Sequence, residues 1–250
     1  MIVSFLTTSD PLYLPKFFER VLPALSGRHA LRVYSVPPLY KNQTPLQAAR
    51  RYLASFGPAA TIQLTIRLLK ARLVRQSIES VCREAGVHCE LISDVNAPEF
   101  LDRMRRDRVD LLVSVSCPQI FERALIELPR LGILNVHGAI LPQYRGVMPS
   151  FWMLANGEQQ AGVSVYFVNE KIDAGELCGQ TIFSIDAEET LDEFITRSKL
   201  RAGELLLRTI DALERGDVPR RALNLVGASY YSWPDAKAVR RFRATGRRLW

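Results

Sequence analysis

An amide and an imidazole lie two residues apart, at Asn135 and His137, in the segment NVHGAILPQYRG. The short apolar run before them predicts a buried strand, and side chains two residues apart on a strand face the same side. Two donors aimed at one point suit the oxyanion of acyl transfer, where one donor lowers the barrier by about 2.7–4 kcal/mol. A lone histidine at a strand end is more often a structural hydrogen-bonder, so the pair needs further support.

A carboxylate follows at Asp173, in the segment KIDAG. Taken alone, an aspartate before Ala-Gly is typical of a turn. Between the two motifs, Pro142 stiffens the loop after His137 and Gly146 gives it conformational freedom. An amide, an imidazole and a carboxylate together favour a catalytic site.

Apolar, β-branched runs alternate with longer amphipathic runs through the first two thirds of the chain. Alternation of this kind predicts an α/β fold with a Rossmann-like, mostly parallel sheet and helices on both faces. Such sheets bind ligands at the carboxyl ends of their strands, which is where residues 135 and 137 lie. Predicted strands cover 2–7, 31–35, 88–92, 110–115 and 132–136, and predicted helices cover 13–25, 98–106 and 118–125.

After the loop, the sequence predicts a helix, a strand hairpin and a long final helix, at 151–156, 162–168 with 178–185, and 191–214. Gly216 is well suited to end the long helix, because glycine accepts the left-handed conformation. We therefore expect a catalytic domain over 1–216 and a short basic C-terminal extension over 217–250. The extension carries an aromatic cluster at 230–233, interpreted mainly as a cover for the sheet edge.

A helix is also predicted over 59–75, with Ile62, Ile66, Leu69 and Leu73 on one face. Its basic residues lie mostly off that stripe. The commoner interpretation is a surface helix that packs its stripe on the core of its own protein. The alternative is a basic amphipathic helix that lies on a membrane surface.

Bulk composition excludes disordered and fibrous classes, because 48% of the 250 residues are hydrophobic and 24% are charged. The net charge of +7 favours anionic ligands without indicating a fold. The four cysteines show no metal-ligand spacing, so reduced thiols and no metal are expected. Neither a signal peptide nor a membrane span is recognisable, which predicts a cytoplasmic protein.

Taken together, these motifs resemble the folate-dependent formyltransferases, a family that includes glycinamide ribonucleotide, methionyl-tRNA and sugar-nucleotide formyltransferases. Members carry an Asn-x-His strand end, a Leu-Pro-x-(Tyr/Trp)-(Arg/Pro)-Gly loop, and an Asp some 38 residues after the Asn. Here Asp173 follows Asn135 by 38 residues, and the stretch NGEQQAGVSVYFVNEKIDAG also matches. The resemblance is good over 110–216 and extends to the first 100 residues only in pattern.

The resemblance implies a formyl donor, N10-formyltetrahydrofolate, and catalytic roles for three residues. Asn135 and His137 would hold the formyl oxygen, while Asp173 would favour the charged imidazole and help to move the proton off the attacking amine. The donor's pteridine would lie between two loops, contacting Pro118, Gln119, Ile120, Phe121, Val168, Asn169 and Ile172. Tyr144 and Arg145 flank the implied cleft and are candidate acceptor-binding residues, although a structural role for Arg145 in the loop is equally compatible with the sequence.

Two departures bear on the acceptor and on the chemistry. Ala139 stands where many members have Ser, and no Gly-Ser-rich phosphate loop follows the first strand. The second departure argues against glycinamide ribonucleotide as the acceptor.

The resulting hypothesis is formyl transfer to the primary amine of a small or sugar-linked acceptor, which includes nucleotide- and lipid-linked sugars. The alternatives are a methionyl-tRNA formyltransferase-like activity, a formyltetrahydrofolate hydrolase, and a non-catalytic binding module. Nucleic acid is not the expected partner, and a homodimer is left open.

Overall fold

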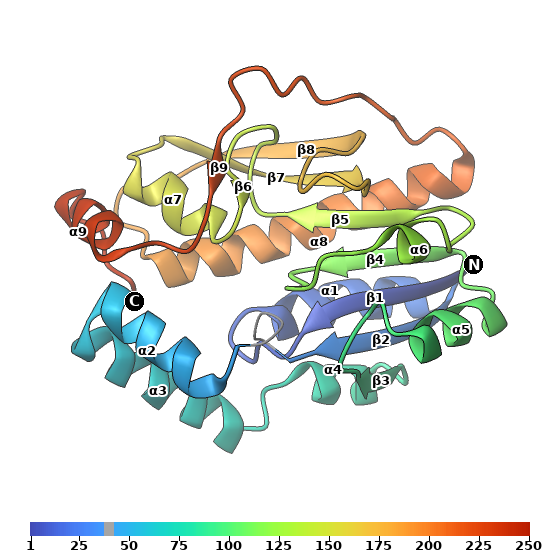
Figure 1. Cartoon of the computed structure of the whole chain (residues 1–250), viewed down its shortest axis with the longest axis horizontal. Coiled ribbons are helices and arrows are strands. Elements are labelled where there is room, and N and C mark those ends of the chain that lie inside the picture. The colour runs from blue at the N-terminus through green and yellow to red at the C-terminus, as the bar shows by residue number, and fades with distance from the viewer. Residues whose placement is uncertain (38–42) are drawn as a thin grey trace.

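The computed structural model describes residues 1–37 and 43–250 (Figure 1). In chain order the elements are β1 (Ile2–Thr8), α1 (Leu14–Ser26), β2 (Ala30–Val36), α2 (Pro45–Phe56), α3 (Pro58–Leu73), α4 (Ile78–Glu84), β3 (His88–Leu91), α5 (Pro98–Arg106), β4 (Leu111–Val115), α6 (Arg123–Ile126), β5 (Ile133–His137), β6 (Arg145–Gly146), α7 (Pro149–Ala155), β7 (Gln160–Phe167), β8 (Leu177–Ser184), α8 (Leu191–Arg215), β9 (Tyr230–Tyr231) and α9 (Ala236–Ala244).

A mixed sheet forms the centre of the molecule. Within the described residues it has seven strands in the order β3-β2-β1-β4-β5-β7-β8, which Figure 1 shows from bottom to top. The first five are parallel, and β7 and β8 join as an antiparallel hairpin beside β5. The chain moves outward in one direction from β1 to β3 and then crosses back to β4, which creates a switch point between β1 and β4. The predicted fold class is confirmed.

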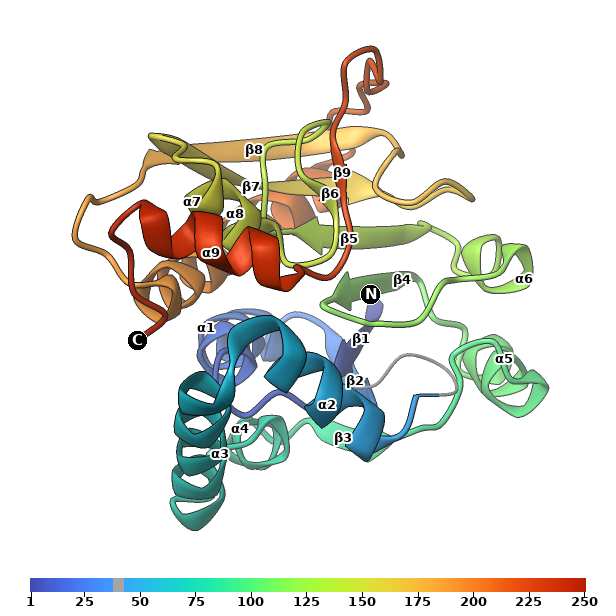
Figure 2. The same cartoon turned by 60° about the vertical axis from the view of Figure 1, so that its left-hand side comes forward.

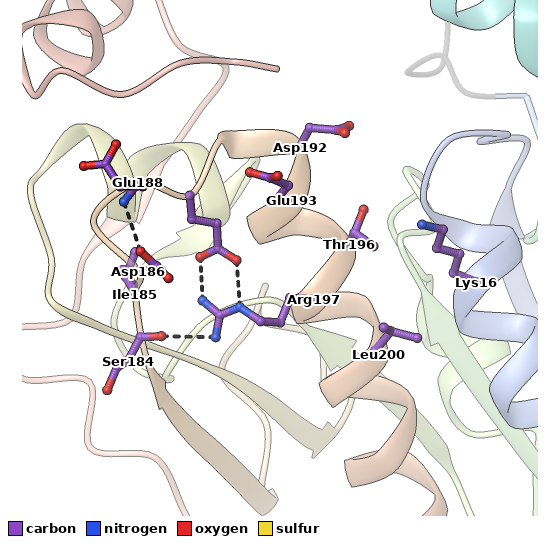
Figure 3. A pocket seen from close by; sticks show the side chains of 11 residues that line it. Lys16, Ser184, Ile185, Asp186, Glu188, Asp192, Glu193, Thr196, Arg197 and Leu200 are labelled. Carbon is purple, nitrogen blue, oxygen red and sulfur yellow. Dashed lines mark hydrogen bonds and ion pairs between the residues drawn. The ribbon is translucent and has the colours of Figure 1, made fainter.

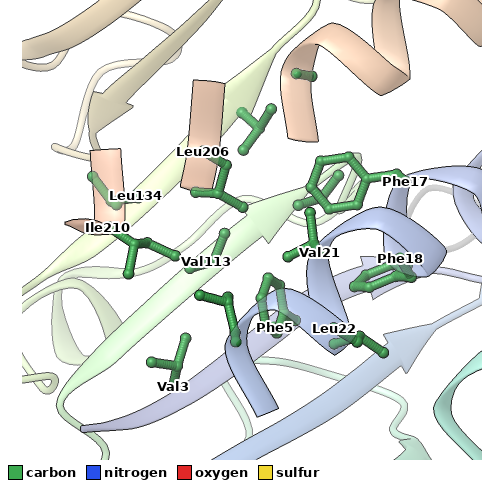
Figure 4. Close-up of a cluster of buried hydrophobic side chains, with 14 of the residues drawn as sticks. Val3, Phe5, Phe17, Phe18, Val21, Leu22, Val113, Leu134, Leu206 and Ile210 are labelled. Atoms are coloured by element: carbon green, nitrogen blue, oxygen red, sulfur yellow. The ribbon is translucent and has the colours of Figure 1, made fainter. Parts of the chain in front are cut away.

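Helices cover both faces of this sheet because its central strands are apolar on both sides. On one face α1, α4 and α8 pack against residues such as Phe5 and Val113, and Figure 4 shows Phe17, Val21 and Leu206 meeting over these strands. On the other face α5 and α6 pack their own buried apolar residues against the sheet.

The long helix α8 begins and ends where its sequence predicts. Thr190 accepts from the backbone N–H of Glu193, whose side chain in turn accepts from the backbone N–H of Thr190. This reciprocal cap satisfies two amides that have no partner inside the helix. Gly216 ends the helix with φ +77°, in the left-handed region.

The C-terminal segment packs on the rest of the molecule. Val239 and Phe242 of α9 are buried against Phe56 and Phe151, in a cluster that joins α2, α7 and α9. The strand β9 pairs with β6 in the loop after His137 (Figure 2). The aromatic cluster at 230–233 therefore supports that loop and α2, and does not cover an edge of the main sheet.

One predicted helix is wrong. Residues 118–125 were expected to be helical, but α6 begins only at Arg123. The preceding segment is held by side chains, because Gln119 bonds to the backbone of Ser93 and Val95, and Asn96 bonds to the backbone of Ile120 and Glu122. These bonds replace the helical ones.

The apolar stripe of α3 was expected to pack on the core of the protein, and this expectation is wrong. Its apolar stripe points away from the core, whereas Ala60 and Ala71 are the buried residues of the helix. No helix in residues 1–37 or 43–250 has the length and apolar composition needed to cross a membrane.

Candidate active site

Asn135 and His137 lie at the carboxyl end of β5, between β4 and β7. In the antiparallel register Asn135 is opposite Tyr166 and His137 is opposite Ser164. The side chain of His137 is buried, with 6% of the residue exposed. The strand end and the hairpin therefore position both polar groups on one rim of the sheet.

Asp173 comes from the loop after β7 and lies against the same rim. Its Oδ1 is 3.7 Å from Nδ1 of His137, which is within ion-pair reach but longer than a direct hydrogen bond. Its Oδ2 accepts a hydrogen bond of 2.7 Å from the backbone N–H of Gly146. The structure thus brings the three predicted side chains together.

The loop that carries Asp173 depends on two local backbone features. Asp173 itself has φ +48°, a left-handed conformation that aspartate tolerates better than most residues. At Gly175 an added Cβ would lie 1.7 Å from the carbonyl oxygen of Phe167. Glycine is required at 175, because any larger residue there would push the loop away from β7.

Tyr166 joins the amide to the carboxylate, and the sequence reading missed it. Its hydroxyl accepts from Asn135 Nδ2 at 2.9 Å and donates to Asp173 Oδ1 at 2.7 Å. Burial, together with the charge of Asp173, raises the pKa of Tyr166 well above its ordinary value, so the hydroxyl stays protonated. Strand pairing was the available signal, since a hairpin strand beside β5 must place one residue opposite Asn135.

His137 has a fixed tautomer. Its Nε2 lies 2.8 Å from the carbonyl oxygen of Tyr144, an atom that can only accept, so Nε2 carries a hydrogen. The other ring nitrogen, Nδ1, faces Asp173. Protonated at Nδ1, the ring can donate a charged hydrogen bond to a substrate oxygen.

The loop after His137 is anchored at several positions. Ser164 Oγ accepts from the backbone N–H of Leu141 and donates to the carbonyl of Ala139. At Gly146, φ is +94° and an added Cβ would lie 2.2 Å from the carbonyl oxygen of Tyr231. Gly146 is therefore needed for the approach of β9, and its N–H supports Asp173.

A lysine lies at the switch point of the sheet, beyond the predicted site residues. Lys199 on α8 donates to Ser116 Oγ at 2.6 Å, directly after β4. Because Val115 pairs with Val136 on the neighbouring strand, Ser116 lies at the same level of the sheet as His137. Burial lowers the pKa of Lys199, although the charge of Asp10 opposes this shift.

A match to a family model decides the family. The model described as "Formyl transferase" matches residues 75–210, which is more than half of the chain and includes Asn135, His137 and Asp173. The chain belongs to the formyl transferase family.

Individual relatives within this family agree with the match. A methionyl-tRNA formyltransferase of Clostridioides difficile is 33% identical over 132 residues, covering 53% of this chain and 43% of the relative. The chain spans about half the length of the curated relatives it matches.

Two solved formyltransferases show the same fold. A sugar N-formyltransferase from a Shewanella species has a TM-score of 0.60 and 19% identity, over 92% of this chain and 76% of that one. An N-formyltransferase of Helicobacter canadensis, in complex with folinic acid and dTDP-3-aminofucose, has a TM-score of 0.59 and 17% identity, over 93% and 71%.

The residues that the formyltransferase resemblance assigned to the donor lie on two loops with different exposure. Ile120 is 68% exposed and Ile172 is 43% exposed, so both are free to contact a ligand. Pro118 is half-buried and Asn169 is exposed. Phe121 and Val168 pack against the buried cluster below α5 and α6, and the side chain of Gln119 is used in the backbone bonds described above.

Tyr144 and Arg145, the candidate acceptor residues, form contacts within the loop after His137. The Tyr144 ring stacks on Tyr231, and its hydroxyl donates to Glu158 at 2.5 Å. Arg145 donates twice to the carbonyl of Ile172, at 3.0 and 2.5 Å, and so connects the loop to the segment that carries Asp173. In this geometry both side chains organise the loop.

A hollow in the surface lies away from the three candidate catalytic residues. It measures about 850 Å³ and lies beside α1, α8 and the end of β8 (Figure 3). Carboxylates such as Asp186, Glu188 and Asp192 line it, and Arg197 is already paired with Glu189. An acidic lining disfavours an anionic folate here.

The described part of this chain has no cluster of three or more His, Cys, Asp or Glu side chains that would hold a metal ion. The four cysteines are free thiols. Burial raises the pKa of Cys117 to about 11 and that of Cys178 to about 12. Neither thiol is therefore a nucleophile near neutral pH.

Proposed function

We propose that this chain transfers a formyl group from N10-formyltetrahydrofolate to a primary amine, with Asn135, His137 and Asp173 as the catalytic residues. The observation that carries this proposal is the meeting of the three side chains at the end of β5. Nδ1 of His137 lies 3.7 Å from Asp173 Oδ1, and Tyr166 connects that carboxylate to Asn135. All four residues lie within the matched family segment.

In the proposed reaction the acceptor nitrogen forms a bond to the formyl carbon, and the C=O electrons move onto oxygen. Asn135 Nδ2 and the protonated Nδ1 of His137 donate hydrogen bonds to this oxyanion. When the intermediate collapses, the bond from the formyl carbon to N10 breaks. The electron pair of that bond takes up a proton, and the acceptor amine loses one, so the charges balance.

Asp173 stabilises the imidazolium and receives the proton of the attacking amine on its way to N10. The 3.7 Å separation leaves the carboxylate near the ring without a direct hydrogen bond between them. Tyr166 and Gly146 each donate to one carboxylate oxygen and so hold its orientation. Tyr166 is thus a positioning residue that acts through Asn135 and Asp173.

We assign the donor to the rim formed by the loop at 118–121 and the loop at 168–172. The exposed side chains of Ile120 and Ile172 support an apolar contact with a flat ring.

We assign the acceptor to the switch point between β1 and β4, where Lys199 lies. Burial disfavours the charged form of Lys199, and an incoming anion would stabilise that form. A phosphate attached to an amino sugar is such an anion. The Helicobacter canadensis protein, which was solved with dTDP-3-aminofucose, supports a sugar-linked amine as the first class to test.

A second candidate acceptor is methionyl-tRNA, because the curated relatives with 27–36% identity are methionyl-tRNA formyltransferases. The chain covers less than two thirds of their length, so the activity of the whole relatives does not follow from the match. A third possibility is a hydrolase that releases formate from the same donor. Such a hydrolase would turn over without any acceptor.

The test is to follow tetrahydrofolate release from the formylated donor with a panel of amines. The panel contains nucleotide-linked and lipid-linked amino sugars, glycinamide ribonucleotide and charged methionyl-tRNA. Release that depends on an amino sugar supports the proposal, and release with tRNA alone supports the second candidate. Formate production without an acceptor, or donor binding without turnover, would refute formyl transfer.

A further inference from the structure

The outer face of α3 carries an unusually exposed apolar stripe. Ile62 is 62% exposed, Ile66 46%, Leu69 55% and Leu73 82%. These residues recur at helical spacing and so form one continuous row. Isolated exposed aliphatic residues are ordinary, but a row of four along three turns of a helix indicates a contact surface.

The opposite face holds α3 on the protein and thereby fixes the outward direction of the stripe. Ala60 and Ala71 are buried on that face. Arg67 forms an ion pair of 2.5 Å with Asp192 at the start of α8. Beyond the helix, Gln76 donates to the carbonyl of Pro11. The stripe therefore cannot turn inward without breaking these contacts.

Basic side chains border the stripe on both sides. At 100° per residue, Lys70 and Arg72 lie about 80° to either side of the centre of the stripe. Arg75 follows at the C-terminal end, and all three residues are exposed. Within the described chain none of the three forms an ion pair. No Asp or Glu occurs between Glu19 and Glu79, so this surface has no acidic residue of its own segment.

We propose that this face of α3 docks on the surface of a bilayer that contains anionic phospholipids. The aliphatic row would enter the boundary between headgroups and acyl chains, while Lys70 and Arg72 extend to the phosphates. The helix lies along the surface and does not cross it, in agreement with the lack of a spanning helix in the described residues.

Charge decides between a lipid surface and a second copy of this chain. A twofold contact through α3 would place this basic surface, whose own segment has no acidic residue, against a copy of itself, and like charges in an interface are unfavourable. An RNA backbone would satisfy the charges, but Ile and Leu side chains cannot stack on bases as aromatic residues do. An anionic bilayer complements both the charges and the aliphatic row.

This surface is independent of the proposed chemistry. It lies on residues 58–73, whereas the family match begins at residue 75 and the candidate catalytic residues lie at the end of β5. Membrane binding and formyl transfer can therefore be measured and lost separately.

The experiment is co-sedimentation of the full chain with phosphatidylcholine vesicles that contain or lack phosphatidylglycerol. Two variants test the surface, namely Leu69→Gln/Leu73→Gln and Lys70→Gln/Arg72→Gln. Two matched controls remove the same kinds of side chain elsewhere, namely Ile182→Gln/Val226→Gln and Arg106→Gln/Arg108→Gln. All of these residues are exposed, so each variant is expected to fold, and circular dichroism checks that it does.

The wild type is expected to bind vesicles only when phosphatidylglycerol is present. Removal of the two basic side chains should weaken binding about twenty-five-fold, because each contributes a factor of roughly five near an anionic surface. Removal of the two leucines should weaken it at least about tenfold. Both controls should bind like the wild type.

Three outcomes would overturn the proposal. One is equal binding to both kinds of vesicle or to neither. Another is a loss of binding in the controls as large as in the α3 variants. The third is a wild type that ignores vesicles while the α3 variants lose self-association or binding to a tRNA mixture.

Discussion

The rim at the end of β5 and the outer face of α3 differ in how their charged side chains are exposed and paired. At the rim Asp173 is 7% exposed and has a donor on each carboxylate oxygen. On α3, Lys70 and Arg72 are exposed and lie beside aliphatic residues that no part of the described chain covers. A buried charge with fixed partners is suited to chemistry, whereas exposed charges beside an apolar row are suited to binding a surface.

The largest expected effect is at His137 itself. His137→Ala removes the only imidazole at the rim, and turnover with the best acceptor should fall about 10²–10⁴-fold. Binding of a reduced-folate analogue, measured by calorimetry, should change little. Loss of folate binding together with activity would instead indicate that the ring supports the donor loops.

Asn135→Ala should produce the next largest loss. Removing one oxyanion donor typically costs about 10²–10³ in kcat, and KM for the donor should be nearly unchanged. Steady-state kinetics with both substrates varied provides the measurement. A change confined to KM would argue against a transition-state role for this amide.

Tyr166→Phe should have a smaller effect, about tenfold in kcat, because it removes the hydroxyl that orients Asp173 and Asn135 without removing either group. The loss should appear in kcat, with KM for both substrates nearly unchanged, because Tyr166 orients the catalytic groups through its bonds to Asn135 and Asp173. Tyr231→Phe is the matched control, since its hydroxyl bonds only Asn156 among the interactions found in the described chain. An equal loss in both tyrosine variants, or a loss confined to KM, would contradict the positioning role of Tyr166.

The smallest effect is expected on α3. Leu69→Gln/Leu73→Gln should change the free energy of unfolding by less than about 0.5 kcal/mol per residue, because exposed side chains contribute little to the core. Phe242→Ala, in the buried cluster with Phe56, should cost about 3–5 kcal/mol. Denaturant titration measures both, and a large loss in the α3 variant would mean that its stripe is buried in solution.

Sequence patterns predicted the fold well where local chemistry leaves one solution. Apolar strands alternating with helices indicate a parallel sheet, and the glycine at 216 marks the end of α8. The positions of Asn135 and His137 followed from their place at a strand end, and the approach of Asp173 followed from the family resemblance.

The remaining features depend on contacts that no local pattern encodes. Tyr166 reaches the site only because β7 returns antiparallel to β5. The segment at 118–122 is irregular because Gln119 and Asn96 bond across to a neighbouring loop. The periodicity of α3 predicted an amphipathic helix, but periodicity alone does not determine which face meets the protein.

The most direct test of formyl transfer follows the carbon itself. Donor labelled in the formyl group is mixed with the acceptor, and mass spectrometry measures the label on the acceptor for the wild type and for His137→Ala at donor concentrations that saturate both. The account predicts labelled N-formyl product from the wild type and very little from a variant that still binds the donor. Label found only in formate, or equal transfer by the two proteins, would contradict it.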